Sequence, residues 1–214
     1  MKKTIIKTAI LTTLSLVMAL FVGIFSTFMF APKLSARICH DLGMKDLSTS
    51  CYERVYKKTG ELEDLIEVID SAVYAENKES VIEYGTILFD TYGDTNRFFE
   101  YCNACDADLE EGGYPTFDYY ANTVFVALYA QGEKTEAAKF ALKNMRAYTG
   151  EDGDKSVLKT ALILANPEND KVFGNILVST YRTMSKEINT SEYALFVRDM
   201  KQYKDADGNQ VYKF

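Results

Sequence analysis

Residues 8–31 read TAILTTLSLVMALFVGIFSTFMFA, an uncharged and mostly apolar run that ends at Pro32 and Lys33. A helix crosses the hydrocarbon core of a bilayer, roughly 30 Å thick, with about 20 residues, so this run is long enough to span it with some tilt. The Thr and Ser hydroxyls within the run can hydrogen-bond to the carbonyl groups of their own helix. The sequence therefore predicts an N-terminal transmembrane helix that tethers the rest of the chain.

The start of the chain also has to be weighed as a targeting signal. Its basic head, Met1-Lys2-Lys3, is found in secretory signals and in signal anchors alike. The apolar run is much longer than the roughly 7–15 residues of a secretory signal, which favours an uncleaved anchor. Cleavage after Ala36 is the alternative, and it would release a secreted protein.

The orientation of the helix is predicted from its flanks. Equal numbers of basic residues lie before and after the run: Lys2, Lys3 and Lys7, then Lys33, Arg37 and Lys45. The count of positive charges therefore gives no direction by itself. The short basic head resembles that of a signal anchor, which leaves the body outside. We expect a single-pass protein of the cell membrane with an extracytoplasmic soluble domain.

Composition narrows the classes of partner. The formal net charge is −7, with 26% charged and 47% apolar residues, values that fit one folded domain rather than a disordered or multi-span chain. Nucleic-acid binding requires a clustered basic surface, and the acidic excess lies in the soluble part. We therefore expect no nucleic-acid partner.

Beyond the anchor, residues that break helices recur every 16–20 positions: Gly60, Asn77, Gly93, Gly113, Gly132, Gly150 and Pro167. Between them, apolar residues repeat at helical spacing, most clearly over residues 62–73. Helices of three to four turns with short connections pack antiparallel to their neighbours. The sequence predicts an all-α body of antiparallel helical hairpins, either a stacked array or an irregular bundle.

We divide the chain into four parts: an N-terminal tail and transmembrane signal anchor (1–33), a juxtamembrane stalk (34–47), a helical-repeat domain (48–204) and a C-terminal tail (205–214). Asp46 or Ser48 is expected to cap a helix over about 49–58. Asp154 is expected to cap a helix over 155–164, and a last helix is expected over about 192–203.

One hairpin has the look of a known family. Residues 124–145 read VFVALYAQGEKTEAAKFALKNM, with an apolar and aromatic first helix, Gly132 at the turn, and Glu136-Ala137 where the second helix packs on the first. This run resembles a tetratricopeptide-type repeat, and residues 52–73 are a weaker copy with Gly60 at the turn. The two glycines are 72 residues apart, close to two repeats of about 34 residues. The resemblance implies a scaffold whose concave face binds protein or peptide segments.

The search for catalytic chemistry begins with histidine. His40, the only histidine, stands beside Cys39. Neighbours in sequence point in different directions on a helix, so we interpret His40 as a polar residue near the membrane boundary rather than a base. We expect no catalytic residue, no metal, no cofactor and no enzymatic activity.

Cys102 and Cys105 have the spacing of a redox or metal pair. A zinc site would need two further ligands, and Cys39 and Cys51 are distant in the sequence. Three interpretations stay open: two thiols packed in the core on one helix face, a disulfide involving some of the four cysteines, or a redox or metal site. The last makes a secreted or membrane-tethered redox or metal protein the alternative function.

Tyrosine is the more suggestive residue type. Tyr119 falls off the helix face shared by Phe117 and Tyr120, and exposed tyrosines recur at binding surfaces. The alternative is that the tyrosines fill grooves between helices. We select Tyr56, Tyr119 and Tyr120 as binding residues. The leading hypothesis is a membrane-anchored protein–protein interaction adaptor that holds a protein or peptide near the membrane surface.

Overall fold

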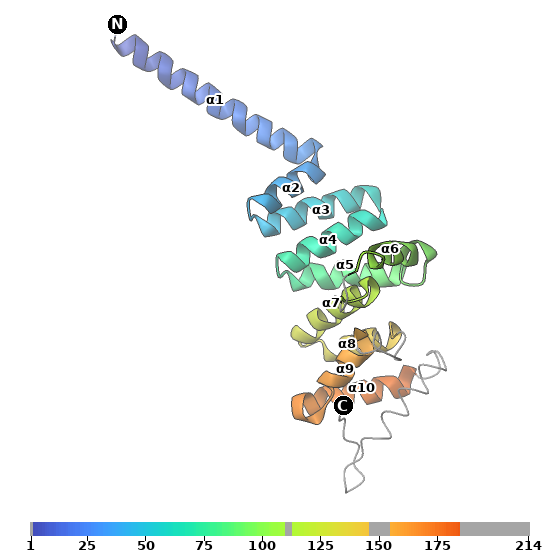
Figure 1. Cartoon of the computed structure of the whole chain (residues 1–214). Coiled ribbons are helices and arrows are strands. Elements are labelled where there is room, and N and C mark those ends of the chain that lie inside the picture. Colours follow the sequence, from blue (N-terminus) through green and yellow to red (C-terminus); the bar gives the residue numbers. More distant parts are fainter. Residues whose placement is uncertain (1, 110–112, 146–154, 185–214) are drawn as a thin grey trace. The chain divides into compact units, whose positions relative to one another are not determined.

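The computed structural model describes residues 2–109, 113–145 and 155–184, and within them every element is an α-helix (Figure 1). The helices are α1 (Lys2–Phe30), α2 (Pro32–Asp41), α3 (Lys45–Thr59), α4 (Leu62–Tyr74), α5 (Lys78–Thr91), α6 (Asn96–Asp106), α7 (Thr116–Ala130), α8 (Lys134–Lys143), α9 (Val157–Leu164) and α10 (Pro167–Met184). The predicted all-α fold is confirmed. The chain divides into two compact units, Met1–Asn77 and Lys78–Phe214.

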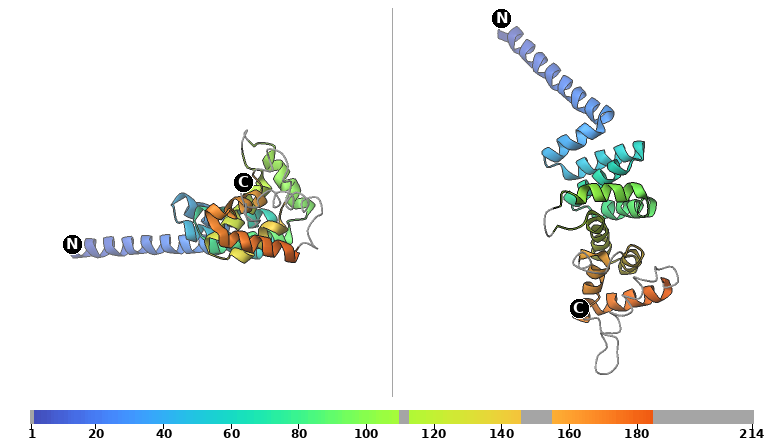
Figure 2. Two further views of the ribbon diagram at one scale, coloured as in Figure 1. Left: turned by 90° about the horizontal axis from the view of Figure 1, so that it is seen from below. Right: turned by 45° about the vertical axis from the view of Figure 1, so that its right-hand side comes forward.

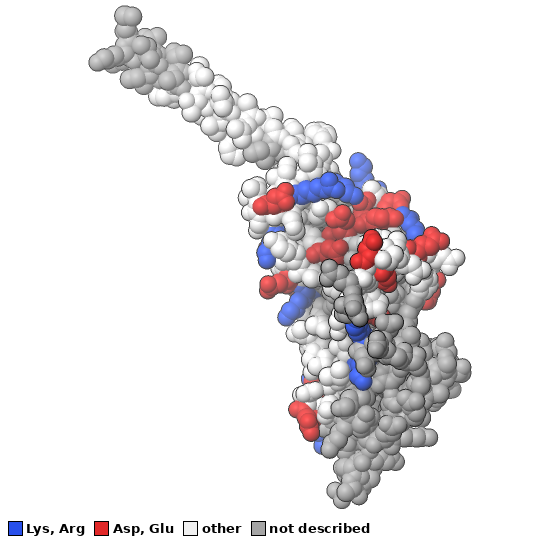
Figure 3. Space-filling view, in the orientation of Figure 1, with Lys and Arg blue, Asp and Glu red and all other residues white. Residues whose placement is uncertain are grey.

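Helix α1 contains a stretch, Ile10–Phe30, that is long and apolar enough to cross a membrane, and none of that window is buried in the protein. Its 21 residues extend over about 32 Å at 1.5 Å per residue. The ribbon is one continuous helix in both views of Figure 2, and its described surface carries no charged side chain in Figure 3. Ser15 and Thr27 donate to the carbonyl oxygens of Leu11 and Gly23 at 2.8 and 2.9 Å, which satisfies their hydroxyls within the helix.

The rest of the first unit is a set of three helices in which α3 packs against both α2 and α4. Apolar residues at helical spacing form the shared core: Ala36, Cys39, Cys51, Tyr52, Val55, Leu62, Leu65, Ile66, Ile69 and Ala72. The segment predicted as a juxtamembrane stalk, 34–47, packs on this core. Most of it is α2, whose inner face (Ser35, Ala36, Cys39) is buried because it meets α3.

Two turns between helices are closed by backbone hydrogen bonds around a residue with a positive φ. After α7, the amide of Gly132 donates to Tyr129 O and that of Glu133 to Leu128 O, both at 3.0 Å, which is the Schellman arrangement. Gly132 has a φ of 86°, as this arrangement needs. After α4 the same pattern is built on Glu76, at a φ of 56°, rather than on the expected Asn77.

In the second unit, α7 packs against α5, α6, α8 and α9, and α10 packs against α8 and α9. Two aromatic clusters fill this core. Phe89 meets Phe98, Phe117 and Phe140 edge to face at 5.1–6.0 Å between ring centroids, and Phe125, Tyr129 and Phe173 form the second cluster.

Several predicted helix starts differ from the structure. The N-cap of α3 is Met44, while Ser48 lies inside the helix and donates its hydroxyl to Ala36 O. Helix α9 is capped by Ser156, whose hydroxyl accepts from the amide of Lys159. Asp154, the helix expected over 192–203 and the tail 205–214 lie outside the described residues.

Candidate functional site

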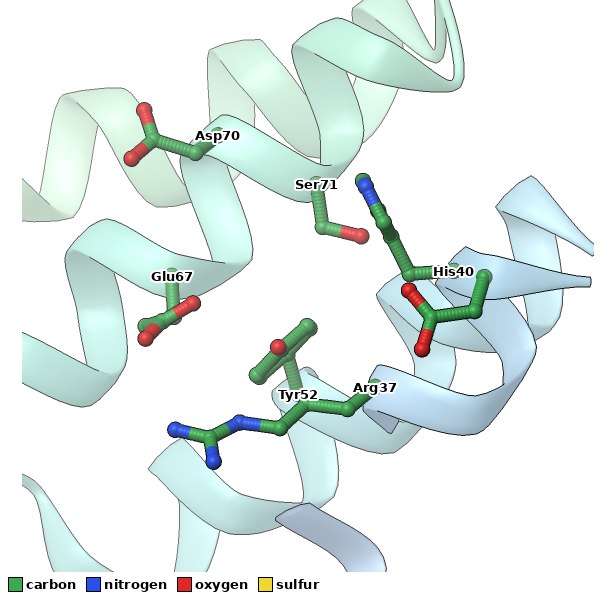
Figure 4. Close-up of a pocket in the computed structure, with 7 residues that line it drawn as sticks. Arg37, His40, Tyr52, Glu67, Asp70 and Ser71 are labelled. Carbon is green, nitrogen blue, oxygen red and sulfur yellow. The ribbon is translucent and has the colours of Figure 1, made fainter. Parts of the chain in front are cut away.

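The first unit contains an open pocket of about 320 Å³. Its lining comes from three helices: Arg37, His40 and Asp41 on α2, Tyr52 on α3, and Glu67, Asp70 and Ser71 on α4 (Figure 4). On both α2 and α4 the lining residues stand at positions i, i+3 and i+4, the spacing that puts side chains on one helix face. The volume is at the small end for ligand sites, and every lining residue carries a polar or charged group. The pocket is suited to a polar or charged group.

Tyr52 is the buried centre of this site. Its phenol lies close enough to the Arg37 guanidinium and the Glu67 carboxylate for both charges to influence its pKa. Burial, followed by the charge of Glu67, raises the pKa of Tyr52 above its ordinary value, so the phenol stays protonated at neutral pH. An acid of α4 and a base of α2 therefore both lie close to the tyrosine.

Ser71, which lines the pocket, belongs to a chain of buried hydroxyls. Ser71 Oγ lies 3.1 Å from Thr49 Oγ1 and 3.3 Å from Ser48 Oγ, and Ser48 Oγ donates to Ala36 O at 2.9 Å. The hydroxyl of Ser71 is thus engaged with other hydroxyls. His40 packs its ring against Tyr74, 4.5 Å between centroids. This arrangement orients donors and acceptors around the pocket, which is the geometry of recognition.

A salt bridge fastens the same helices close to α1. Lys33 Nζ lies 2.8 Å from Asp64 Oδ1, and Thr59 donates to Asp64 Oδ2 at 2.8 Å. Burial acts to raise the pKa of Asp64, but the hydrogen bonds from Lys33 and Thr59 outweigh it and hold that pKa below its ordinary value. The hydrogen bond to Asp64 raises the pKa of Lys33. The pocket helices α2 and α4 are therefore joined three residues after the candidate span ends.

The charges that line the pocket are unbalanced. The lining includes three carboxylates, of Asp41, Glu67 and Asp70, and one guanidinium, of Arg37. Acidic and basic side chains also gather on the visible face of α2–α4 in Figure 3. An excess of carboxylates raises the local concentration of cations and favours a positively charged group. The site is chemically matched to an amine or a guanidinium.

The tyrosines selected from sequence do not form one site. Tyr56, on α3, is half-buried and belongs to the first unit, while Tyr119 and Tyr120 belong to the second. Tyr119 is 41% exposed, whereas Tyr120 is only 5% exposed and is a core residue. Of the three, Tyr119 has the exposure that a binding residue requires.

The cysteine pair is also divided by burial. Cys102 is buried and Cys105 is exposed, so the two thiols do not share the core as one interpretation expected. Within the described residues, no group of three or more His, Cys, Asp or Glu side chains is placed to hold a metal ion.

Sequence reasoning missed the pocket. The sequence predicts His40 only as a polar residue near the membrane boundary. Arg37 enters only in the count of basic residues that flank the apolar run. The usable signal was the repeated i, i+3, i+4 spacing of polar residues on two helices whose other faces are apolar.

The fold and the site together define an α-helical protein with a candidate membrane span and an acidic pocket in its first unit. Comparison with protein-family models, with curated proteins and with solved structures finds no match.

Proposed function

We propose that this chain is a single-pass membrane adaptor whose helical body binds a basic segment of a protein or peptide partner near the membrane surface. The observation that carries the proposal is the pocket between α2, α3 and α4, whose lining includes three carboxylates and one guanidinium. A lysine or arginine side chain is the protein group that fits this charge and size.

The anchor is the second part of the proposal. Ile10–Phe30 meets the length and composition of a span. The alternative, cleavage after Ala36, would remove Lys33 with its bridge to Asp64 and the first half of α2. Ala36 is fully buried and its carbonyl accepts from Ser48. The packing of this junction favours a chain that keeps its N-terminus.

An extracytoplasmic body remains our proposal for the topology, because the short basic head resembles that of a signal anchor. The tetratricopeptide-type resemblance is likewise proposed. It is supported by the α7–α8 hairpin, in which Gly132 stands at the turn with a positive φ and Ala137 is buried. Under this proposal the second unit adds a scaffold surface, with Tyr119 as the exposed candidate.

Binding to synthetic peptides tests the pocket. Full-length protein in detergent is titrated with three sets of peptides of equal length that are basic, neutral or acidic. We expect basic peptides to bind best, and the variant Glu67→Gln with Asp70→Asn to weaken them about 5- to 10-fold, the loss expected when a partly buried charge pair loses its anion.

The matched control is Glu79→Gln, an exposed acid of α5, which should leave the affinity unchanged. Equal binding of acidic and basic peptides, or an affinity that does not respond to the pocket substitutions, would contradict the proposed function.

A further inference from the structure

Two cysteines outside the Cys102/Cys105 pair lie side by side in the first unit. Cys39 comes from α2 and Cys51 from α3, helices that pack directly on each other. Each side chain is 1% exposed, and the two thiols are close enough to influence each other's pKa. The fold therefore brings together two thiols that are 12 positions apart in the sequence.

We propose that Cys39 and Cys51 form an intramolecular disulfide that fastens α2 to α3 when the first unit folds in an oxidising compartment. Its formation in the cell rests on the extracytoplasmic location proposed above, whereas the pairing itself rests only on the packing of α2 on α3. Disulfides persist in oxidising compartments and are rare in the cytosol.

The bond forms by exchange with an external disulfide, supplied by oxidised glutathione or by a disulfide oxidoreductase. The thiolate of one cysteine attacks that disulfide, forms a mixed disulfide and releases one thiol of the oxidant. The second cysteine then attacks the mixed disulfide at its own partner's sulfur, closes the Cys39–Cys51 bond and releases the second thiol. Two electrons and two protons pass in total to the oxidant, which is reduced to two thiols.

Burial determines when this exchange takes place. Removal from water raises the pKa of both Cys39 and Cys51, which lowers the thiolate fraction in the folded, reduced protein. Their burial also keeps them from a protein oxidant. The bond therefore forms during folding or in a locally opened state, and the finished bond is protected from reductants in the same way.

The position of the pair links this bond to the binding pocket. Cys39 lies between Arg37 and His40 on α2, and Cys51 precedes Tyr52 on α3. A disulfide between these positions fixes α2, which supplies one wall of the pocket, to α3, which supplies Tyr52 at its centre. A rigid pocket loses less entropy when a ligand binds.

The test begins with purified full-length protein in detergent, refolded in a buffer of oxidised and reduced glutathione. Free thiols are blocked with N-ethylmaleimide under denaturing conditions, and peptides are mapped by mass spectrometry without reduction. We expect a linked pair of peptides containing Cys39 and Cys51, with Cys102 and Cys105 alkylated. Alkylation of Cys39 and Cys51, or a link from either to another cysteine, would overturn the pairing.

Thermal unfolding supplies a second readout that needs no substitution. Breaking a bond that closes a loop of this length should lower Tm by about 5–10 °C when wild type is unfolded with reductant. The shift should disappear in Cys39→Ala and in Cys51→Ala and remain in the controls Cys102→Ala and Cys105→Ala. A reductant shift that survives Cys39→Ala would overturn the proposal.

A third arm separates the pairing from the location. Native membranes are denatured in the presence of N-ethylmaleimide before the protein is extracted, and its peptides are mapped in the same way. A linked pair supports the bond and the extracytoplasmic body together. Suppose instead that the pair oxidises after purification but is found alkylated in the native membrane. That result would overturn both the presence of the bond in the cell and the extracytoplasmic location. It would not affect the peptide-binding test of the pocket.

Discussion

At the scale of single residues, Asp170 has the most strongly lowered pKa among the described carboxylates of the second unit. Its Oδ2 accepts from Lys134 Nζ at 2.5 Å and from the Tyr129 hydroxyl at 2.6 Å, and its Oδ1 accepts from the Phe173 amide at 2.9 Å. The Lys134 and Tyr129 hydrogen bonds lower the pKa of Asp170 to about 2. Burial, together with Asp170, raises the pKa of Tyr129 to about 12.

These shifts predict how stability depends on pH. The folded pKa of Asp170 is depressed, so its contribution is complete above the ordinary carboxyl value near 3.8 and is lost as pH falls towards 2. The difference corresponds to about 2 kcal/mol at pH 7. Asp170 has a non-helical backbone conformation within α10, and its side chain caps the part of the helix that follows it. Asp170→Asn keeps the shape of that side chain but removes its charge. It should lower the free energy of unfolding in urea by about that amount at pH 7 and by much less at pH 2.5.

Asp90→Asn is the control for this experiment. Asp90 pairs with Lys143 at 2.6 Å, but both side chains are 56% exposed, and exposed pairs contribute little. A loss as large for Asp90→Asn as for Asp170→Asn would mean that net charge, rather than the Asp170 contacts, controls stability. On the alkaline side, the raised pKa of Tyr129 predicts a further loss as pH rises towards 12, which Tyr129→Phe should abolish.

Glu76 provides a second prediction at this scale. It is the only residue other than glycine with a positive φ among the described residues. The left-handed conformation costs a residue that has a side chain about 1–2 kcal/mol, a cost that glycine removes. Glycine also increases the conformational entropy of the unfolded chain, which destabilises the folded state by about 0.4–1 kcal/mol. Glu76→Gly should therefore raise the free energy of unfolding by about 0.5–1 kcal/mol. Glu79→Gly, inside α5, should lower it, and a decrease for both variants would contradict the role given to the turn.

At the scale of helices, the contact between α5 and α7 depends on the absence of a side chain. A Cβ added at Gly85 would clash with Val124 Cγ2 on α7. Gly85→Ala should destabilise the protein by about 1–3 kcal/mol, the usual range for an overpacked core. The variant with both Gly85→Ala and Val124→Ala should recover part of that loss, because the second change makes room for the first. Additive losses in denaturant unfolding would contradict direct contact at this crossing.

The same scale shows what sequence can predict. Apolar spacing and glycine turns located α4, α5 and α7 within a few residues, because helical periodicity is local information. The caps of α3 and α9 were wrong, since which polar residue caps a helix depends on where tertiary packing begins it. Residues 34–41 were assigned to a stalk because they follow the anchor, whereas their burial is decided by α3.

The site was less predictable than the fold for the same reason. Arg37, Tyr52 and Glu67 come from three helices, and nothing local in the sequence joins them. Tyr120 was selected because its stretch of sequence is rich in aromatic residues, but its exposure is set by contacts in the second unit. Tyr119 was predicted to face solvent from its angular position alone, and its 41% exposure agrees.

At the scale of the whole molecule, the proposed role of α1 is to hold the body at a membrane. Arginine in the middle of a span costs about 2.5–3.5 kcal/mol on insertion scales. Leu16→Arg combined with Leu20→Arg, both within Ile10–Phe30, should release a large fraction of the protein from membranes washed with alkaline carbonate. Leu42→Arg combined with Leu47→Arg, at exposed leucines beyond the span, should not. The proposed anchor would be contradicted if the Leu16→Arg/Leu20→Arg variant stayed in the membrane as fully as the wild type. A mature chain that begins at residue 37 would contradict it as well.

The central claim is that the pocket of the first unit holds a partner while α1 holds the protein in the membrane. The most direct measurement is photo-crosslinking of full-length protein in its native membrane, with benzoylphenylalanine at Tyr74, whose ring packs on His40, and at Tyr119 as the comparison. The account predicts a discrete adduct from position 74 that is lost when Glu67→Gln and Asp70→Asn remove two pocket carboxylates. No adduct from position 74, or one indifferent to those substitutions, would contradict it, and an adduct from position 119 alone would move the binding surface to the second unit.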